Sequence, residues 1–144
     1  MDRIPPIKSV MTPFPYAIEA DAPLRQARNR MLQHEIRHLP VTRRHRLVGV
    51  LTDRDLKRAL DPSLGLAPKN ELFVEDVMVA DAYAVSMDEP LDHVLAEMAE
   101  RHIGCALVVK GDQLAGIFTS TDACRLFADE LNERFGSGED GDAA

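Results

Sequence analysis

Two Thr-x-x-Asp motifs, Thr52 to Asp55 and Thr119 to Asp122, hold the side chains best suited to binding chemistry. A threonine followed three residues later by a carboxylate has the form of a helix capping box, in which both side chains satisfy free backbone groups. The same helix start suits phosphate, because it offers unpaired N–H groups and the positive end of the helix dipole. The aspartate can also accept hydrogen bonds from a ribose diol. The motif alone leaves two alternatives open: a helix start and nothing more, or a helix start that binds a nucleotide.

The segment His34 to His38 matches the zinc-protease motif H-E-x-x-H letter for letter. That chemistry needs both histidines on one face of a continuous helix, with Glu35 as the base and a third ligand elsewhere. Pro40 disfavours helical geometry at the residue before it, so the helix should end nearby and His38 should begin a strand. No third ligand stands out among His45, His93 and His102. We therefore expect no zinc catalysis and no metal ligand here.

The remaining nucleophiles do not form a recognisable catalytic set. Cys105 lies in an apolar segment and Cys124 near an expected helix start, and neither has an evident His–acid pair in the sequence. The chain contains no Walker loop and no dinucleotide-binding glycine fingerprint. Two cysteines are too few for a disulfide framework, so we expect reduced, mostly buried thiols in a cytosolic protein. The chain is not expected to be an enzyme.

The composition excludes several classes of protein. Of the 144 residues 45% are hydrophobic, yet no stretch approaches the roughly 18 consecutive apolar residues of a membrane helix. The first residues lack the charged and apolar regions of a signal peptide, so a cytoplasmic location is expected. The net charge of -7 argues against bulk binding of nucleic acid, which needs cations to neutralise its phosphates.

The charges are divided unevenly along the chain. Residues 25–58 hold ten Arg or Lys and three acids, whereas residues 74–125 hold three bases and ten acids. The basic half could attract a small anion, or it could dock on the acidic half of a second copy. The alternative to both is that the two halves present solvated faces of opposite charge that bind nothing.

The chain contains an internal duplication with an offset of 67 residues. Residues 7–58 align with residues 74–125 without a gap, and 15 of the 52 aligned positions are identical. The identities fall on turn residues and periodic apolar positions, where a shared fold would need them. Two copies of one supersecondary unit are therefore expected.

Each copy has the pattern of a β-α-β-β-α unit. A short extended piece, 16–18 or 83–85, precedes a turn that ends in proline, and apolar residues at helical spacing follow. Two strands joined by a turn come next, at 39–42 and 47–51 in the first copy and at 106–109 and 114–118 in the second. A closing helix is expected to begin near Asp53 and near Ser120.

These patterns predict the domain organisation and the fold class. Residues 7–60 and 74–127 are the two repeats, residues 61–73 a linker, and residues 128–144 a helix end with a disordered acidic tail. A unit this small buries little surface alone, so the two sheets should pack together. The expected fold is a mixed α/β (α+β) arrangement of two repeats related by pseudo-two-fold symmetry.

The duplicated unit resembles the CBS domain, named after cystathionine β-synthase, over about residues 7–127. The resemblance lies in the opening Val10-Met11-Thr12-Pro13, in the strand His38-Leu39-Pro40-Val41, and in the pattern Gly-hydrophobic-x-Thr-x-x-Asp. That last pattern occurs twice, from Gly49 and from Gly116, in register with the whole duplication. The resemblance implies a stand-alone tandem CBS pair.

The resemblance also implies two ligand clefts, because CBS pairs that bind AMP, ATP or S-adenosylmethionine hold the ligand between the repeats. One repeat supplies the threonine and the aspartate, and the other supplies a base pocket from its opening segment and first hairpin strand. One cleft would combine Thr119, Thr121 and Asp122 with Thr12, Ala17, Ile36, Arg37 and His38. The other would combine Thr52, Arg54 and Asp55 with Val79, Ala84, Ile103, Gly104 and Cys105.

The two clefts are expected to differ. Arg37 and His38 stand where related nucleotide-binding repeats place basic phosphate contacts, whereas the second copy has Gly104 and Cys105 there. Val79 also replaces the hydroxyl of Thr12. The cleft with Arg37 should therefore suit a phosphorylated ligand better.

The resemblance implies a non-catalytic regulatory module that binds AMP, ADP, ATP or S-adenosylmethionine, needs no other cofactor, and signals to an effector protein. A homodimer formed through helices is expected from the family, and the last helix carries apolar Leu126, Phe127, Leu131 and Phe135. Ordinary packing within the chain is the alternative for those four. The rival function is a protein-interaction or dimerisation scaffold whose clefts are vestigial or bind a metal ion. Binding of polyanions by the basic half is a third, weaker hypothesis.

Overall fold

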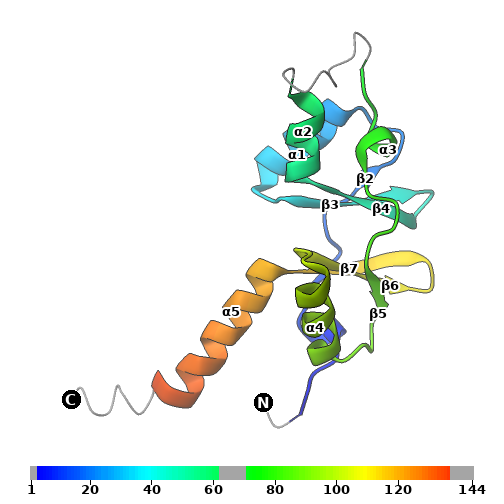
Figure 1. Cartoon of the computed structure of the whole chain (residues 1–144). Helices are drawn as coiled ribbons and strands as arrows, with labels where there is room; N and C mark the ends of the chain where they lie inside the picture. The colour runs from blue at the N-terminus through cyan, green and yellow to red at the C-terminus, as the bar shows by residue number, and fades with distance from the viewer. Residues whose placement is uncertain (1–2, 62–70, 137–144) are drawn as a thin grey trace.

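The computed structural model describes residues 3–61 and 71–136 (Figure 1). The predicted linker therefore lies largely outside the described residues, at 62–70, and so does the predicted tail after residue 136. The first repeat contains β1 (Thr12–Pro13), β2 (Ile18–Glu19), α1 (Leu24–His34), β3 (His38–Arg43), β4 (Arg46–Thr52) and α2 (Asp53–Leu60). The second contains α3 (Val74–Val77), β5 (Ala84–Ser86), α4 (Leu91–Arg101), β6 (Cys105–Lys110), β7 (Gln113–Thr119) and α5 (Ser120–Leu131). A 3-10 turn (Ile7–Ser9) precedes β1, and a π-helical turn (Asn132–Gly136) follows α5.

The first helix of each repeat begins and ends at matched positions. Pro23 and Pro90 stand at the N-caps of α1 and α4 with extended backbone, so their missing N–H groups cost no helical hydrogen bond. Glu35 and His102 end the two helices in the left-handed region, with φ of 53° and 54°. Because α1 ends at His34 and His38 opens β3, the two histidines of the H-E-x-x-H segment do not share a helix. The predicted helix end before His38 is confirmed.

The strands of the described residues form one seven-stranded mixed sheet in the order β2-β3-β4-β7-β6-β5, with β1 paired to β7 outside this path. In each repeat a parallel pair leads into an antiparallel hairpin. Both hairpins change register at equivalent places, between Val41 and Thr42 and between Val108 and Val109. The halves join at a single β4–β7 residue pair, Arg46 with Gln113. The expected mixed fold of two related repeats is confirmed.

Three apolar clusters hold the molecule together. One lies under the helices of the first repeat and includes the fully buried Leu39 and Val41. The second lies in the second repeat and includes the fully buried Phe118. The third lies between the two hairpins and is formed by Val50, Cys105, Leu107 and Ile117. In this third cluster the two halves of the sheet pack on each other. This packing adds the buried surface that a single small repeat lacks. Figure 1 shows the two halves of the sheet face to face, with α1 and α2 outside one half and α4 outside the other.

The opening segment of each repeat packs on the other repeat. Ile7 is completely buried in the cluster of the second repeat, and its N–H donates to the carbonyl of Glu89. Conversely, Val74 is completely buried in the cluster of the first repeat, and its N–H donates to the carbonyl of Ala22. The two repeats are thus interlocked, and sequence boundaries near residues 7 and 74 do not coincide with the spatial boundary between the cores.

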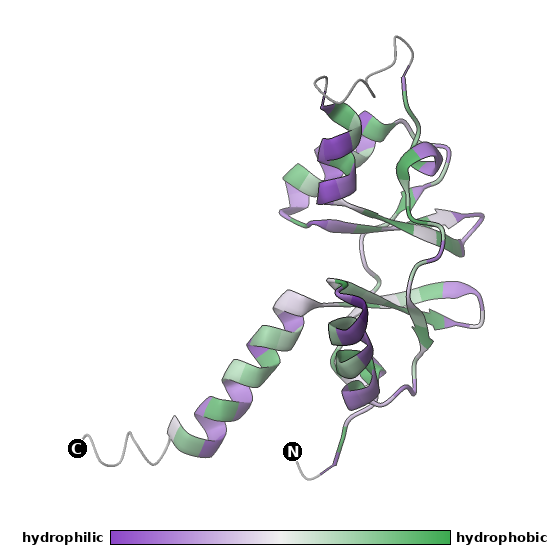
Figure 2. Cartoon of the chain, viewed as in Figure 1, coloured by the Kyte–Doolittle hydropathy of each residue, from purple (hydrophilic) through white to green (hydrophobic). Residues whose placement is uncertain are grey.

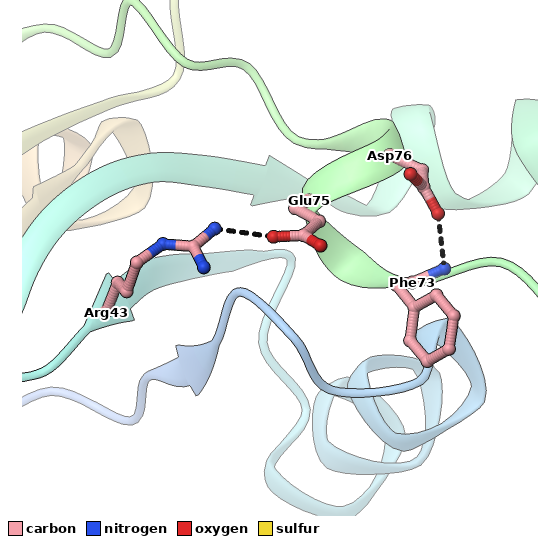
Figure 3. Close-up of polar contacts among 4 residues, drawn as sticks. All are labelled: Arg43, Phe73, Glu75 and Asp76. Atoms are coloured by element: carbon pink, nitrogen blue, oxygen red, sulfur yellow. Dashed lines mark hydrogen bonds and ion pairs between the residues drawn. The ribbon is translucent and has the colours of Figure 1, made fainter.

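Polar contacts fasten α3 to the first repeat (Figure 3). The carboxylate of Glu75 forms an ion pair with the guanidinium of Arg43, which lies at the end of β3. The N–H of Phe73 donates to Oδ2 of Asp76 at 2.9 Å and caps the start of α3. This helix of four residues is therefore stabilised both by its own cap and by contacts with the first repeat.

Glycine is required where the opening segments cross the hairpins. A Cβ at Gly49 would lie 2.7 Å from the carbonyl oxygen of Val79, and a Cβ at Gly116 would lie 2.3 Å from Sδ of Met11. The two glycines therefore let each Val-Met opening segment approach the hairpin of the other repeat, which explains why the family pattern begins with glycine.

The cysteines correct one expectation. Cys105 is buried, as expected, but Cys124 is exposed on α5, so the expectation of mostly buried thiols is wrong for one of the two. Within residues 3–61 and 71–136 no helix has the length and apolar character needed to cross a membrane.

Candidate functional site

Two cavities lie where the helices α2 and α5 begin. We name them after the N-cap threonines: the Thr52 cleft, of about 670 Å³, and the Thr119 cleft, of about 760 Å³. Both volumes fall in the range of roughly 300–1,000 Å³ that small-molecule sites occupy. Each cleft takes side chains from both repeats, because a closing helix of one repeat faces the opening segment of the other.

The structure brings together most of the predicted binding residues. The Thr52 cleft is lined by Thr52, Arg54, Asp55, Val79, Ile103, Gly104 and Cys105, and the Thr119 cleft by Thr12, Ile36, Arg37, His38, Thr119, Thr121 and Asp122. Ala17 and Ala84, at equivalent positions, do not line either cavity. The carbonyl of Ala17 instead accepts a hydrogen bond from Arg30, and Ala84 pairs with Leu107 in the sheet.

The Thr-x-x-Asp motifs cap their helices in two different ways. In α5 the N–H of Asp122 donates to Oγ1 of Thr119 at 3.2 Å, and the N–H of Thr119 donates to Oδ2 of Asp122 at 2.9 Å. In α2 the N–H of Asp55 likewise donates to Oγ1 of Thr52, but the Thr52 hydroxyl donates to Oδ2 of Asp55 at 2.8 Å. In both helices Oδ2 makes the cap contact, so Oδ1 is the oxygen that could meet a ligand.

The first hairpin strand of each repeat is tied to the helix start. The N–H of Asp53 donates to the carbonyl of Arg37 at 2.8 Å, and the N–H of Ser120 donates to the carbonyl of Gly104 at 2.9 Å. These bonds hold the strand residues beside the free end of the helix. Residues 37 and 104 therefore lie beside the helix starts, close to the N–H groups that suit an anion.

Arg37 and His38 line both clefts, whereas the sequence assigned them to the Thr119 cleft alone. For His38 the small residue at position 104 gives the reason: a Cβ on Gly104 would lie only 3.0 Å from Nε2 of His38. The imidazole of His38 thus occupies space next to Gly104, between the two cavities.

The charge of His38 also differs from expectation. Burial, and after it the neighbouring Arg37 cation, lower the pKa of His38 below its usual value, against a smaller opposing effect of Asp53. His38 is therefore mainly neutral at pH 7, and it can serve as a hydrogen-bonding group rather than as the basic phosphate contact that the resemblance implied. Arg37 remains the cation shared by both clefts.

Aromatic residues at the cleft walls were missed by the sequence analysis. In the Thr119 cleft Tyr16 stacks on His34 with ring centroids 3.7 Å apart, and Phe14 is 94% exposed with φ of 49°. In the Thr52 cleft the guanidinium of Arg101 lies 5.2 Å from the centroid of the Tyr83 ring. The identity of Tyr16 and Tyr83 across the 67-residue offset was the signal that could have pointed to them.

The Thr52 cleft contains one cysteine thiol, that of Cys105. Burial raises the pKa of the Cys105 thiol to about 11, so this group lines the Thr52 cleft as a neutral thiol and not as a nucleophilic thiolate. Among residues 3–61 and 71–136, no group of three or more His, Cys, Asp or Glu side chains could hold a metal ion. The donors that gather in the clefts are instead helix N–H groups, hydroxyls and guanidinium groups.

Comparison with known proteins identifies the family of the two repeats. The family model for the CBS domain matches the chain twice, at residues 7–62 and 74–129. The L-aspartate semialdehyde sulfurtransferase of Methanocaldococcus jannaschii is 30% identical over 123 residues. The match covers 84% of this chain but only 23% of that protein, so the shared part is a fraction of the enzyme.

Two solved structures are similar along nearly their whole length. The CBS domain pair of protein MJ0100, in complex with 5′-methylthioadenosine and S-adenosyl-L-methionine, is 28% identical with a TM-score of 0.79, over 89% of this chain and 99% of that one. Hypoxic Response Protein I, with two coordinated zinc ions, is 25% identical with a TM-score of 0.70, over 83% of this chain and 97% of that one.

Proposed function

Because the chain belongs to the CBS domain family, we propose that it is a non-catalytic regulatory module that binds adenosine-type ligands between its two repeats. The observation that carries this proposal is the pair of clefts, each with a Thr-x-x-Asp helix start facing the opening segment of the other repeat. The helix N–H groups and the threonine suit the phosphate or another anionic group, and the remaining aspartate oxygen suits the ribose diol. The similar MJ0100 pair was solved with two adenosine compounds, which agrees with this chemistry.

Signalling would follow from the interlocked repeats. Each cleft contains residues of both repeats, so a ligand that fits one relative orientation better stabilises that orientation. The strength of the signal equals the difference in ligand affinity between the two orientations. An effector protein that contacts only one orientation would read this change.

A panel of ligands in a thermal-shift assay tests the proposal. A ligand at about 100 times its dissociation constant should add roughly 2.7 kcal/mol to the free energy of unfolding. We expect AMP, ADP, ATP, S-adenosylmethionine or 5′-methylthioadenosine to raise the melting temperature, with guanosine compounds as the matched control. A shift with zinc or magnesium alone, and none with any adenosine compound, would favour the metal-binding scaffold instead.

The apolar face of α5 favours an interaction surface as well. No residue of α5 is buried, and Phe127, Leu131 and Phe135 are 64%, 42% and 64% exposed. Figure 2 shows the helix extending away from the second sheet with hydrophobic residues along its length. Phe127 and Leu131 lie four residues apart and therefore on one face. We propose that a second copy of the chain covers this face and that the module is a homodimer.

Replacing Phe127 by glutamate is expected to convert the dimer into a monomer, because burying the new carboxylate in an apolar interface would be costly. Analytical ultracentrifugation at several protein concentrations measures the change. Arg125→Glu is the matched control, since Arg125 lies two residues away on the opposite side of the same helix and should leave the dimer intact. A monomeric wild-type protein, or equal effects of the two variants, would contradict the proposed interface.

A further inference from the structure

We infer that the two clefts bind different classes of adenosine compound: the Thr52 cleft an adenosine di- or triphosphate, and the Thr119 cleft an adenosine derivative without phosphate. This inference rests on the proposed function and adds to it the ligand class of each cleft. It also reverses the preference that the sequence suggested, because that preference depended on Arg37, which lines both cavities.

The first observation is the number of cations in each cleft. Cations of the Thr52 cleft are Arg37, Arg54, Lys57 and Arg101, and its carboxylates are Asp53, Asp55 and Asp81. The Thr119 cleft has Arg37 as its single Arg or Lys among the described lining residues, together with the carboxylates of Glu35 and Asp122. The Thr52 cleft therefore has a formal charge of +1 and the Thr119 cleft one of -1 with histidines neutral. A polyphosphate is attracted by the first and repelled by the second.

The difference is built into matched positions of the duplication. Arg54, Lys57 and Arg101 correspond, at the 67-residue offset, to Thr121, Cys124 and His34. Three cations of the Thr52 cleft are thus absent from the equivalent places around the Thr119 cleft. The backbone frame of the two clefts is the same, with a threonine N-cap and an aspartate three residues later. Ligand class is therefore set by side-chain charge and not by the fold.

The placement of Arg54 and Lys57 points to an anion. Arg54 is the second residue of α2 and so lies near the positive end of the helix dipole, where a cation is unfavourable, whereas Lys57 lies in the last turn of this helix. Lys57 is paired with Asp53 at 3.1 Å, but its side chain is 77% exposed, so it can turn towards a ligand. A bound phosphate chain between the helix N-terminus and these two side chains would offset their mutual repulsion and the unfavourable position of Arg54 at the helix start.

The Thr119 cleft has an apolar wall in place of these cations. Phe14, Pro15 and Tyr16 line it, and Phe14 is held with φ of 49°, a backbone conformation that is uncommon for a bulky residue. The residue that matches Phe14 in the Thr52 cleft is Asp81. Exposed aromatic faces attract purine rings and sulfonium or other organic cations. An adenosine thioether or sulfonium compound fits these walls, whereas a triphosphate does not.

Titration calorimetry with ATP and with 5′-methylthioadenosine tests the inference. We expect the wild-type chain to bind one ATP, and the ATP-saturated protein still to bind one 5′-methylthioadenosine. Arg54→Thr, which copies the residue of the other repeat, should weaken ATP binding roughly 10- to 100-fold through loss of a charged contact and leave 5′-methylthioadenosine binding unchanged. The reciprocal change, Thr121→Arg, removes the net negative charge of the Thr119 cleft and should strengthen the binding of ATP there.

Arg58→Thr is the matched control, because Arg58 lies on the same helix, carries the same charge and does not line either cleft. Two equal ATP sites in the wild-type chain would overturn the inference and leave the proposed function intact. The same conclusion would follow if Arg54→Thr and Arg58→Thr weakened ATP binding equally. Absence of binding by both compounds would overturn the proposed function together with the inference.

Discussion

Replacing Asp55 and Asp122 together by alanine is expected to abolish the binding of adenosine compounds while the protein remains folded. Each aspartate offers a carboxylate oxygen to a ribose diol, and a hydrogen bond to a charged group contributes about 1.5–3 kcal/mol. The free carboxylate oxygen can accept hydrogen bonds from both hydroxyls of the diol. Loss of these two bonds in a cleft corresponds to a loss in affinity of at least roughly 100-fold. Calorimetric titration of the double variant and of each single variant would measure this loss cleft by cleft.

The difficulty in this experiment is that both aspartates also contact the N-cap threonine of their helix. Asp122 accepts a hydrogen bond from the N–H of Thr119 at 2.9 Å, and losing a cap costs about 1 kcal/mol of stability. Asp76→Ala separates the two effects, because Asp76 accepts the N–H of Phe73 at the same 2.9 Å but lines neither cleft. The control should lose similar stability and no affinity. Wild-type affinity in the double variant would mean that the motifs are helix caps and nothing more.

Ile7→Ala is expected to lower the free energy of unfolding by about 2–5 kcal/mol, as for other fully buried aliphatic residues. Ile7 opens the first repeat in sequence, yet its side chain is completely buried in the cluster of the second repeat. The variant should therefore destabilise the second repeat and, through the interlocked opening segments, unfold the whole chain in one transition. Urea unfolding followed by circular dichroism would give the change in stability.

Ile4→Ala is the matched control for that experiment. Ile4 precedes Ile7 by three residues and is 58% exposed, so the same deletion of atoms should change stability by less than about 0.5 kcal/mol. Equal effects of the two variants would mean that the opening segment does not pack as described. Two separate unfolding transitions would mean that the repeats are not interlocked.

Local features of the fold could be predicted from the sequence because they depend on neighbouring residues. Proline at positions 23 and 90 and apolar residues at helical spacing correctly predicted α1 and α4. The hairpins and the starts of the closing helices followed from strand patterns and from the Thr-x-x-Asp caps. The gapless duplication then required that the two halves share one fold, which the matched helix ends at Glu35 and His102 confirm.

Long-range features could not be predicted in this way. The burial of Ile7 in the second repeat depends on a contact with residues some 80 positions away, for which a hydrophobic pattern carries no information. The same limit applies to His38, which lies against the small Gly104 of the other repeat and lines both clefts. Cys124 lies on α5, in which no residue is buried. Its exposure could therefore not be inferred from its apolar neighbours in the sequence.

The candidate site was predictable in outline and not in its chemistry. The residues proposed for ligand binding come mostly from motifs that recur at the 67-residue offset, and recurrence points to shared geometry. The properties that distinguish the clefts come from positions where the copies differ, such as Phe14 against Asp81 and Lys57 against Cys124. The effect of these differences on ligand binding can be judged only from the fold, which shows that Phe14, Asp81 and Lys57 line a cleft.

The most direct measurement is a two-dimensional ¹H–¹⁵N NMR titration of the wild-type protein with 5′-methylthioadenosine and then with ATP. If the clefts bind adenosine compounds, the largest shifts should appear at the backbone N–H groups of the helix starts, Thr121 and Asp122 with the first ligand and Arg54 and Asp55 with the second. The N–H groups of the Arg43–Arg46 turn, which is rich in cations and lines neither cleft, should stay unchanged. Unchanged helix starts at saturating ligand, or shifts confined to the Arg43–Arg46 turn, would contradict a ligand-binding role for these clefts.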